Sequence, residues 1–80
     1  MTNNNCCAYV AVKTEPKATK EVFRKLADTR CVKKVNTVTG RYDILLFMET
    51  TTPKELFDTV LTQIRTCPGI TFTETWPCCE

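Results

Sequence analysis

The chain has 80 residues, of which 42% are apolar and 25% charged, and its formal net charge is +2. This length allows one domain and leaves no room for a second, so we assign residues 1–80 to a single domain. The charges form no basic stripe, which argues against nucleic-acid binding, and the longest apolar runs are too short to cross a membrane. The amino-terminal residues lack the shape of a signal peptide, so we expect a cytoplasmic protein.

Two residue counts narrow the function further. The chain has no histidine, which removes the commonest general base and the commonest transition-metal ligand. The sequence also places no pair of carboxylates in one pocket that could do acid–base chemistry in place of a histidine. We therefore expect a binding protein and not an enzyme, with no organic cofactor. The chain also has six cysteines, many for a cytoplasmic protein of this size.

The first half of the chain predicts strand, helix and strand. Residues 6–13 are almost continuously apolar, which indicates a strand buried on both faces. Apolar residues recur at helical spacing over 18–27, and this helix is expected to end near 28–30. Residues 31–39 are mixed in polarity and predict a second strand, and their paired lysines are typical of an exposed edge strand. Gly40 supplies the positive φ that a tight hairpin needs.

The second half predicts strand, helix and strand again. Residues 42–49 read as a central strand that is apolar on both faces. Thr52, followed by proline and then by Glu55, is a typical helix start, and an apolar stripe continues from there to Ile64. The Cys-Pro-Gly sequence at 67–69 ends this helix, and a last strand follows.

The element order β-α-β-β-α-β predicts a fold of the α+β class. Right-handed crossovers turn it into a ferredoxin-like, four-stranded antiparallel sheet with the first and third strands central and both helices on one face. The other face stays apolar and uncovered. Covering roughly 500 Å² of it per subunit is worth on the order of 12 kcal/mol before association costs, comparable to the stability of a small domain. We therefore predict a homodimer joined through the sheet face, a dimeric α/β barrel.

Three segments resemble a known family. The sequence VTGRYDIL at 38–45 resembles the V-T-G-x-Y-D-hydrophobic signature of the effector-binding domain of Lrp/AsnC regulators, also called the RAM domain. The segments IRTCPGI at 64–70 and TET at 73–75 support the match, which covers about Ala8 to Trp76. The resemblance implies dimers with facing sheets, larger rings built from them, and small-molecule effectors, often amino acids, bound between dimers.

The resemblance also implies an effector site. Carried over to this sequence, it comprises Thr39, Gly40, Arg41, Tyr42 and Asp43. Hairpin carbonyls and Asp43 can receive an ammonium group, while Arg41 can meet a carboxylate. The alternative is purely structural: Gly40 serves the turn, Tyr42 packs, and Asp43 bonds to hairpin amides.

Full-length relatives carry a DNA-binding helix-turn-helix before this domain. Only five residues precede the first predicted strand here. The chain therefore resembles the stand-alone form, which is not expected to bind DNA by itself.

Four cysteines near the two ends depart from the family pattern. The first and last strands are expected to be antiparallel neighbours about 4.8 Å apart, which would gather Cys6, Cys7, Cys78 and Cys79. Thiolates alone suit a soft ion, so a Cu(I) or Zn(II) site is one interpretation. Cross-strand disulfides, as a staple or a redox switch, are the second, although a reducing cytoplasm disfavours a permanent bond. Thiols without a function are the third.

For the other two cysteines the sequence predicts only a packing role. Cys31 and Cys67 each follow a predicted helix, and we place both at the end of the sheet remote from the terminal cysteines. Free cysteine often fills small buried sites of this kind.

Overall fold

The structure, a computed structural model, describes residues 6–78. A π-helical turn, η1, continues the second helix. The elements in chain order are β1 (Cys6–Thr14), α1 (Thr19–Ala27), β2 (Val32–Thr37), β3 (Ile44–Thr50), α2 (Pro53–Thr59), η1 (Val60–Ile64) and β4 (Ile70–Pro77).

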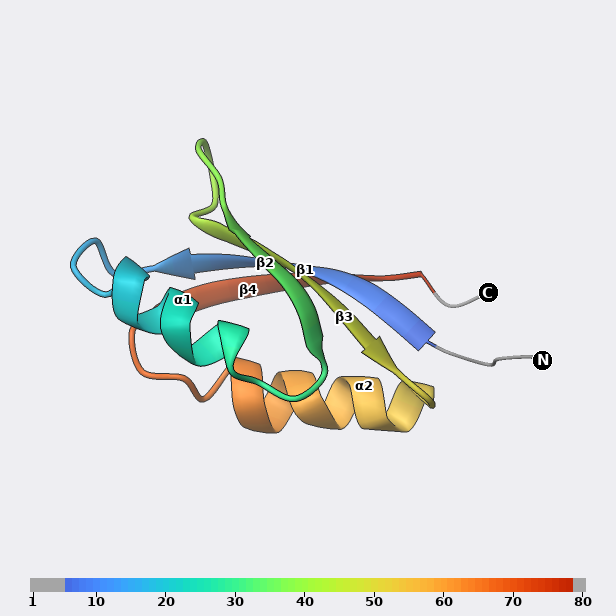
Figure 1. The fold of residues 1–80 in the computed structure, drawn as a ribbon. Helices are drawn as coiled ribbons and strands as arrows, with labels where there is room; N and C mark the ends of the chain where they lie inside the picture. Colours follow the sequence, from blue (N-terminus) through green and yellow to red (C-terminus); the bar gives the residue numbers. More distant parts are fainter. Residues whose placement is uncertain (1–5, 79–80) are drawn as a thin grey trace.

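The strands form one antiparallel sheet in the order β2-β3-β1-β4, with β1 and β3 central. Both helices lie on the same face of this sheet (Figure 1). The predicted ferredoxin-like α+β fold is thereby confirmed. The start of β1 lies beside the end of β4, since Ala8 is opposite Pro77.

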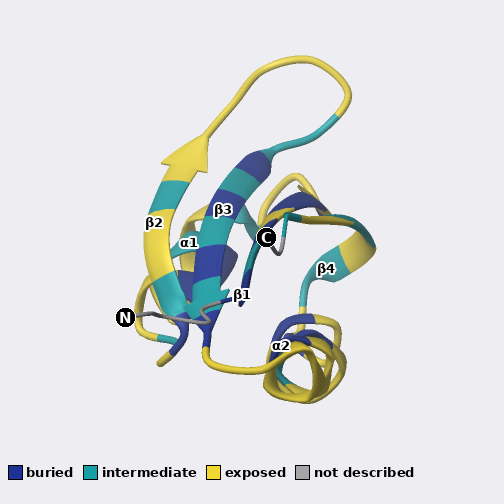
Figure 2. Cartoon of the chain, turned by 90° about the vertical axis from the view of Figure 1, so that its right-hand side faces the viewer, coloured by how far each residue is buried: buried dark blue, intermediate teal, exposed yellow. Residues whose placement is uncertain are grey.

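The core lies between the sheet and the helices. Val22 and Leu26 of α1 and Leu56 of α2 are fully buried against the central strands. On β3, buried and half-buried residues alternate along the strand, because successive side chains point to opposite faces (Figure 2). The face without helices is therefore only partly covered within one subunit, as is expected from the sequence for a sheet with both helices on one side.

The second helix starts as the sequence predicts. The Thr52 side chain accepts a hydrogen bond from the Glu55 amide at 3.1 Å, and Pro53 occupies the first turn. The Glu55 carboxylate accepts hydrogen bonds from the Thr51 amide at 3.3 Å and from the Thr51 hydroxyl at 3.0 Å. The bond from the Glu55 amide satisfies one of the donors that a helix start leaves without intrahelical partners, and the other two fix Thr51, the residue before the cap.

The end of this helix differs from the prediction. The Arg65 amide donates to the Val60 carbonyl, five residues earlier, at 2.9 Å, which is the bond of a π turn. Widening a helix disturbs its regular carbonyl partners. Thr62 and Thr66 compensate, because their hydroxyls donate to the carbonyls four residues earlier at 2.7 and 2.6 Å.

The β2–β3 connection is wider than the predicted tight hairpin. β3 begins at Ile44 and not at Tyr42, which leaves residues 38–43 as a loop that protrudes from the body of the domain (Figures 1 and 2). Gly40 has the predicted positive φ, +105°. The loop closes through the Val38 amide, which donates to the Asp43 carbonyl at 3.0 Å.

Cys31 and Cys67 are buried in the core, as predicted. The prediction of their position is wrong for Cys31. Its carbonyl accepts from the Glu49 amide at 3.0 Å, and Glu49 lies opposite Cys7. Cys31 therefore lies at the same end of the sheet as the start of β1. Neither helix of the described part of the chain is long and apolar enough to cross a membrane.

Candidate functional site

The loop 38–43 holds the five predicted effector-binding residues, and two of them are engaged within the subunit. The Asp43 carboxylate accepts from the Thr14 amide at 2.8 Å and from the Thr14 hydroxyl at 3.3 Å, both through Oδ2. The Asp43 amide donates to the Val12 carbonyl at 2.9 Å. Asp43 thus fixes the base of the loop to the end of β1, whereas the structural alternative expected bonds to hairpin amides.

Tyr42 is held from a different side. Its hydroxyl donates to the Glu74 carboxylate, and its ring stacks on Phe72 with centroids 6.4 Å apart. This hydrogen bond, helped by desolvation and by the negative charge of Glu74, raises the pKa of Tyr42 above its ordinary value. The hydroxyl is therefore a neutral donor at physiological pH.

The remaining three residues, Thr39, Gly40 and Arg41, are exposed at the tip of the loop. A Cβ built on Gly40 meets no atom within 4 Å. The loop therefore combines an anchored base with an open tip that carries a guanidinium group.

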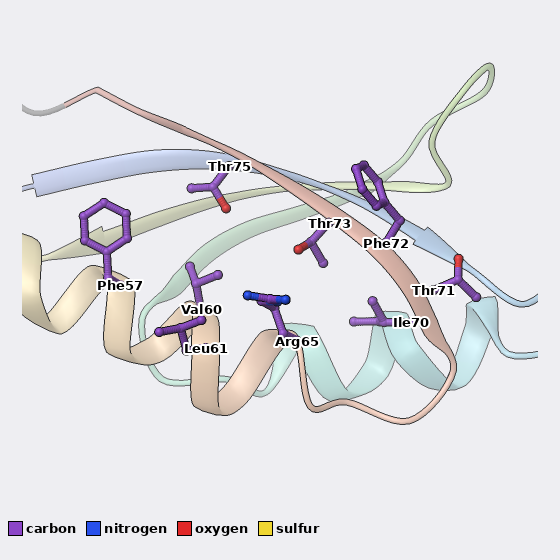
Figure 3. A pocket seen from close by; sticks show the side chains of 9 residues that line it. All are labelled: Phe57, Val60, Leu61, Arg65, Ile70, Thr71, Phe72, Thr73 and Thr75. Carbon is purple, nitrogen blue, oxygen red and sulfur yellow. The ribbon is translucent and has the colours of Figure 1, made fainter.

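A groove between the second helix and β4 was missed by sequence reasoning. Its volume is about 630 Å³, and the side chain of Arg65 points into it between the helix and the strand (Figure 3). Its walls combine apolar and hydroxyl side chains. They are Phe57, Val60, Leu61, Arg65, Ile70, Thr71, Phe72, Thr73 and Thr75. The available signal was the recurrence of threonine at every second position of 71–75, which places a row of hydroxyls on one side of a strand.

Of the three terminal cysteines that the structure describes, Cys7 and Cys78 come together. The Cys78 amide donates to the Cys7 carbonyl at 2.8 Å, and the two Sγ atoms are 2.7 Å apart. Cys6 is buried on the helix-covered face, opposite Thr50. Cys79 lies outside the described residues. Across residues 6–78, no three side chains of the cysteine, aspartate and glutamate types gather where they could hold a metal ion.

The face of the sheet without helices is aromatic. Tyr9, Phe72 and Trp76 are 46%, 55% and 45% exposed. Tyr9 lies opposite Trp76, and its ring centroid is 5.0 Å from that of Phe47. Apolar patches this concentrated usually mark an interaction site. We call the surface formed by Tyr9, Phe47, Phe72 and Trp76 the open face.

Comparisons with known proteins agree on one family. The model of the Lrp/AsnC ligand binding domain matches residues 7–80. No curated protein gave a significant sequence match. The structure is similar to that of hypothetical protein PHS023 from Pyrococcus horikoshii, with 31% identity and a TM-score of 0.88 over 94% of this chain and 90% of that one. It is also similar to FFRP-DM1, with 32% identity and a TM-score of 0.88 over 91% of this chain and 97% of that one.

A more distant structure has a ligand in its title. The transcriptional regulator NMB0573 from Neisseria meningitidis, described as a complex with L-Met, has 20% identity and a TM-score of 0.84. The match covers 98% of this chain and 52% of that regulator, and at this identity it shows the fold alone.

Proposed function

Because this chain belongs to the Lrp/AsnC ligand-binding domain family, whose domains are regulatory and not enzymatic, we propose that it is an oligomeric module that binds a small effector at the loop 38–43. The observation that carries the proposal is the build of this loop. Tyr42 and Asp43 are fixed by bonds to β4 and β1, while the tip with Arg41 stays open. Such a loop is positioned by a rigid scaffold, as binding loops usually are.

A second subunit is needed to complete the site. Pockets for small molecules bury about 70–90% of the ligand surface, which an exposed loop tip cannot do alone. The open face offers a route to a homodimer, and higher oligomers would bring further subunits to the loops. The module would act in the cytoplasm, without direct contact to nucleic acid, as its charge pattern predicts.

An amino acid fits the chemistry of the loop. The Arg41 guanidinium can form a bidentate pair with a carboxylate, and loop carbonyls can accept from an ammonium group. Asp43 can contribute less than the sequence predicted, since Oδ2 already serves Thr14. The L-Met complex of NMB0573 supports an amino acid as the class of effector.

The groove beside Arg65 is the competing place for the same class of effector. Its single cation among apolar walls suits a carboxylate with an apolar side chain. The two places differ in which arginine meets the carboxylate. Arg41 and Arg65 therefore form a matched pair for a test.

Isothermal titration with the twenty amino acids is expected to reveal at least one ligand with a dissociation constant between about 1 μM and 1 mM, or roughly 4–8 kcal/mol of binding free energy. Arg41→Gln should weaken that binding by about tenfold or more, because a charged hydrogen bond is lost, while Arg65→Gln should leave it unchanged. Absence of heat from every amino acid would count against the proposal. Loss of binding in Arg65→Gln alone would move the effector to the groove.

The soft-metal site at Cys6, Cys7, Cys78 and Cys79 stays a prediction. In its favour, the backbones at Cys7 and Cys78 are adjacent. The helix-facing position of Cys6 opposes it, because a shared ion would require that side chain to change faces. The test is anaerobic titration with Cu(I) and with Zn(II) of the wild type and of a variant in which these four cysteines are replaced by serine. If there is no site, both proteins bind the same number of ions. A site shows as stoichiometric binding that the four-serine variant loses.

A further inference from the structure

Cys7 and Cys78 face each other across the β1–β4 pair. The strand register places Ala8 opposite Pro77, and the next step outward places Cys7 opposite Cys78. The Cys78 amide confirms this step, because it donates to the Cys7 carbonyl. Opposite residues in a hydrogen-bonded antiparallel pair have Cα atoms about 5.5 Å apart, which is within the range that a disulfide spans.

The two sulfur atoms are in direct contact. Their separation is 2.7 Å, and the Cys7 thiol also reaches the Cys78 carbonyl at 3.2 Å. Two thiolates on a tetrahedral Zn(II), each with a bond of about 2.3 Å, lie about 3.8 Å apart, whereas a disulfide bond measures about 2.05 Å. The observed separation is therefore nearer to that of a disulfide than to that of two thiolates on one Zn(II).

Within one subunit the pair is partly exposed to solvent. Cys7 and Cys78 are half-buried, whereas Cys31 and Cys67 are buried in the core. Oxidation of cysteine follows exposure, so the terminal pair should react before the core cysteines. The chain therefore carries its own internal reference thiols.

We propose that Cys7 and Cys78 are a redox modification site, at which a peroxide converts two thiols into one intramolecular disulfide. One thiolate attacks a peroxide oxygen and becomes a sulfenic acid while the other oxygen leaves as water. The second thiol then displaces the sulfenic hydroxyl as a second water molecule, so that two thiols and one hydrogen peroxide give one disulfide and two waters. A small dithiol can reverse the bond by thiol–disulfide exchange.

The bond would join the first strand to the last. It would close a loop that includes most of the chain, and cross-links over long loops restrict the unfolded chain most. The oxidised module should therefore be more resistant to unfolding than the reduced one. In a reducing cytoplasm such a bond is transient, which is the behaviour of a sensor and not of a structural staple. This inference does not depend on effector binding.

The full chain treated with hydrogen peroxide should lose 2 Da per subunit, remain monomeric on a denaturing gel without reductant, and unfold about 10 °C higher than before treatment. Cys7→Ser and Cys78→Ser should each abolish the mass loss and the shift. The matched controls Cys6→Ser and Cys79→Ser should retain both. Circular dichroism of each variant shows whether it is folded.

Three results would overturn the proposal. The first is a mass loss of 2 Da that persists in Cys7→Ser or Cys78→Ser, since another pair would then be oxidised. The second is a cross-link between subunits. The third is one equivalent of copper or zinc that co-purifies with the anaerobic protein, depends on Cys7 and Cys78, and prevents their oxidation. Recovery of the original number of free thiols after dithiothreitol treatment of the oxidised wild type would show that the disulfide is reversible.

Discussion

Tyr9→Glu is expected to convert the protein from a dimer into a monomer, with a dimer dissociation constant raised at least about 100-fold, or about 2.7 kcal/mol. Tyr9 lies in the middle of the open face, opposite Trp76 and beside Phe47, with nearly half of its surface exposed in one subunit. A carboxylate at this position would have to lose its water without gaining a partner when two such faces meet. Sedimentation equilibrium over a range of protein concentrations measures the change.

Leu61→Glu is the matched control for the dimer. Leu61 is 51% exposed, close to the value for Tyr9, but it lies on the helical side of the domain. The same change of charge there should leave the dimer intact. Dissociation of both variants to the same extent would mean that charge alone weakens the dimer. A wild-type protein that stays monomeric at micromolar concentration would refute association through the open face.

Gly69→Ala is expected to lower the free energy of unfolding by about 3 kcal/mol, the sum of two costs. Gly69 has a φ of +96°, where an alanine costs roughly 1–2 kcal/mol. Its new Cβ would also lie 2.7 Å from the Ala18 Cβ and 3.1 Å from Val22 Cγ2, and such overpacking costs about 1–3 kcal/mol. Urea denaturation at a fixed protein concentration measures the sum, since association contributes to stability.

Gly40→Ala separates the two costs. Gly40 has a similar φ of +105°, but a Cβ there meets open space, so the variant should lose only about 1–2 kcal/mol. The double variant Gly69→Ala, Ala18→Gly removes the closest contact and should recover part of the loss. Equal destabilisation of the two single variants would show that backbone conformation, and not the contact with α1, explains the effect.

The fold was predictable because its signals are local and agree with one another. The helix start at Thr52, the glycine at 40 and the apolar runs at 6–13 and 42–49 each specify one element, and their order leaves few topologies. The pairing of the first and last strands followed from that order and is confirmed. The family was predictable from the loop sequence at 38–45, which the family match now supports.

The parts that the sequence did not reveal depend on longer-range packing. Tyr42 reads as a strand residue, but it lies in the loop before β3, where its hydroxyl bonds to Glu74 on β4. Asp43 reads as a hairpin residue, but its carboxylate is oriented by Thr14. The end of the sheet at which Cys31 lies was predicted wrongly although the element order determines it. β1 and β2 are both antiparallel to β3, so the start of β2 lies at the same end of the sheet as the start of β1. Cys78 contacts Cys7 and not Cys6 because successive side chains of β1 point to opposite faces of the sheet.

The π turn at 60–64 bears on how relatives of this chain can vary in length. Such a turn holds one residue more than an α-helical turn, and here it forms the last turn of the second helix. A homologue lacking one residue between Val60 and Ile64 could close a regular helix there and still present Leu56 to the core. We therefore expect single-residue gaps between related sequences to fall in this stretch, outside the strands, where one added residue would reverse every side chain.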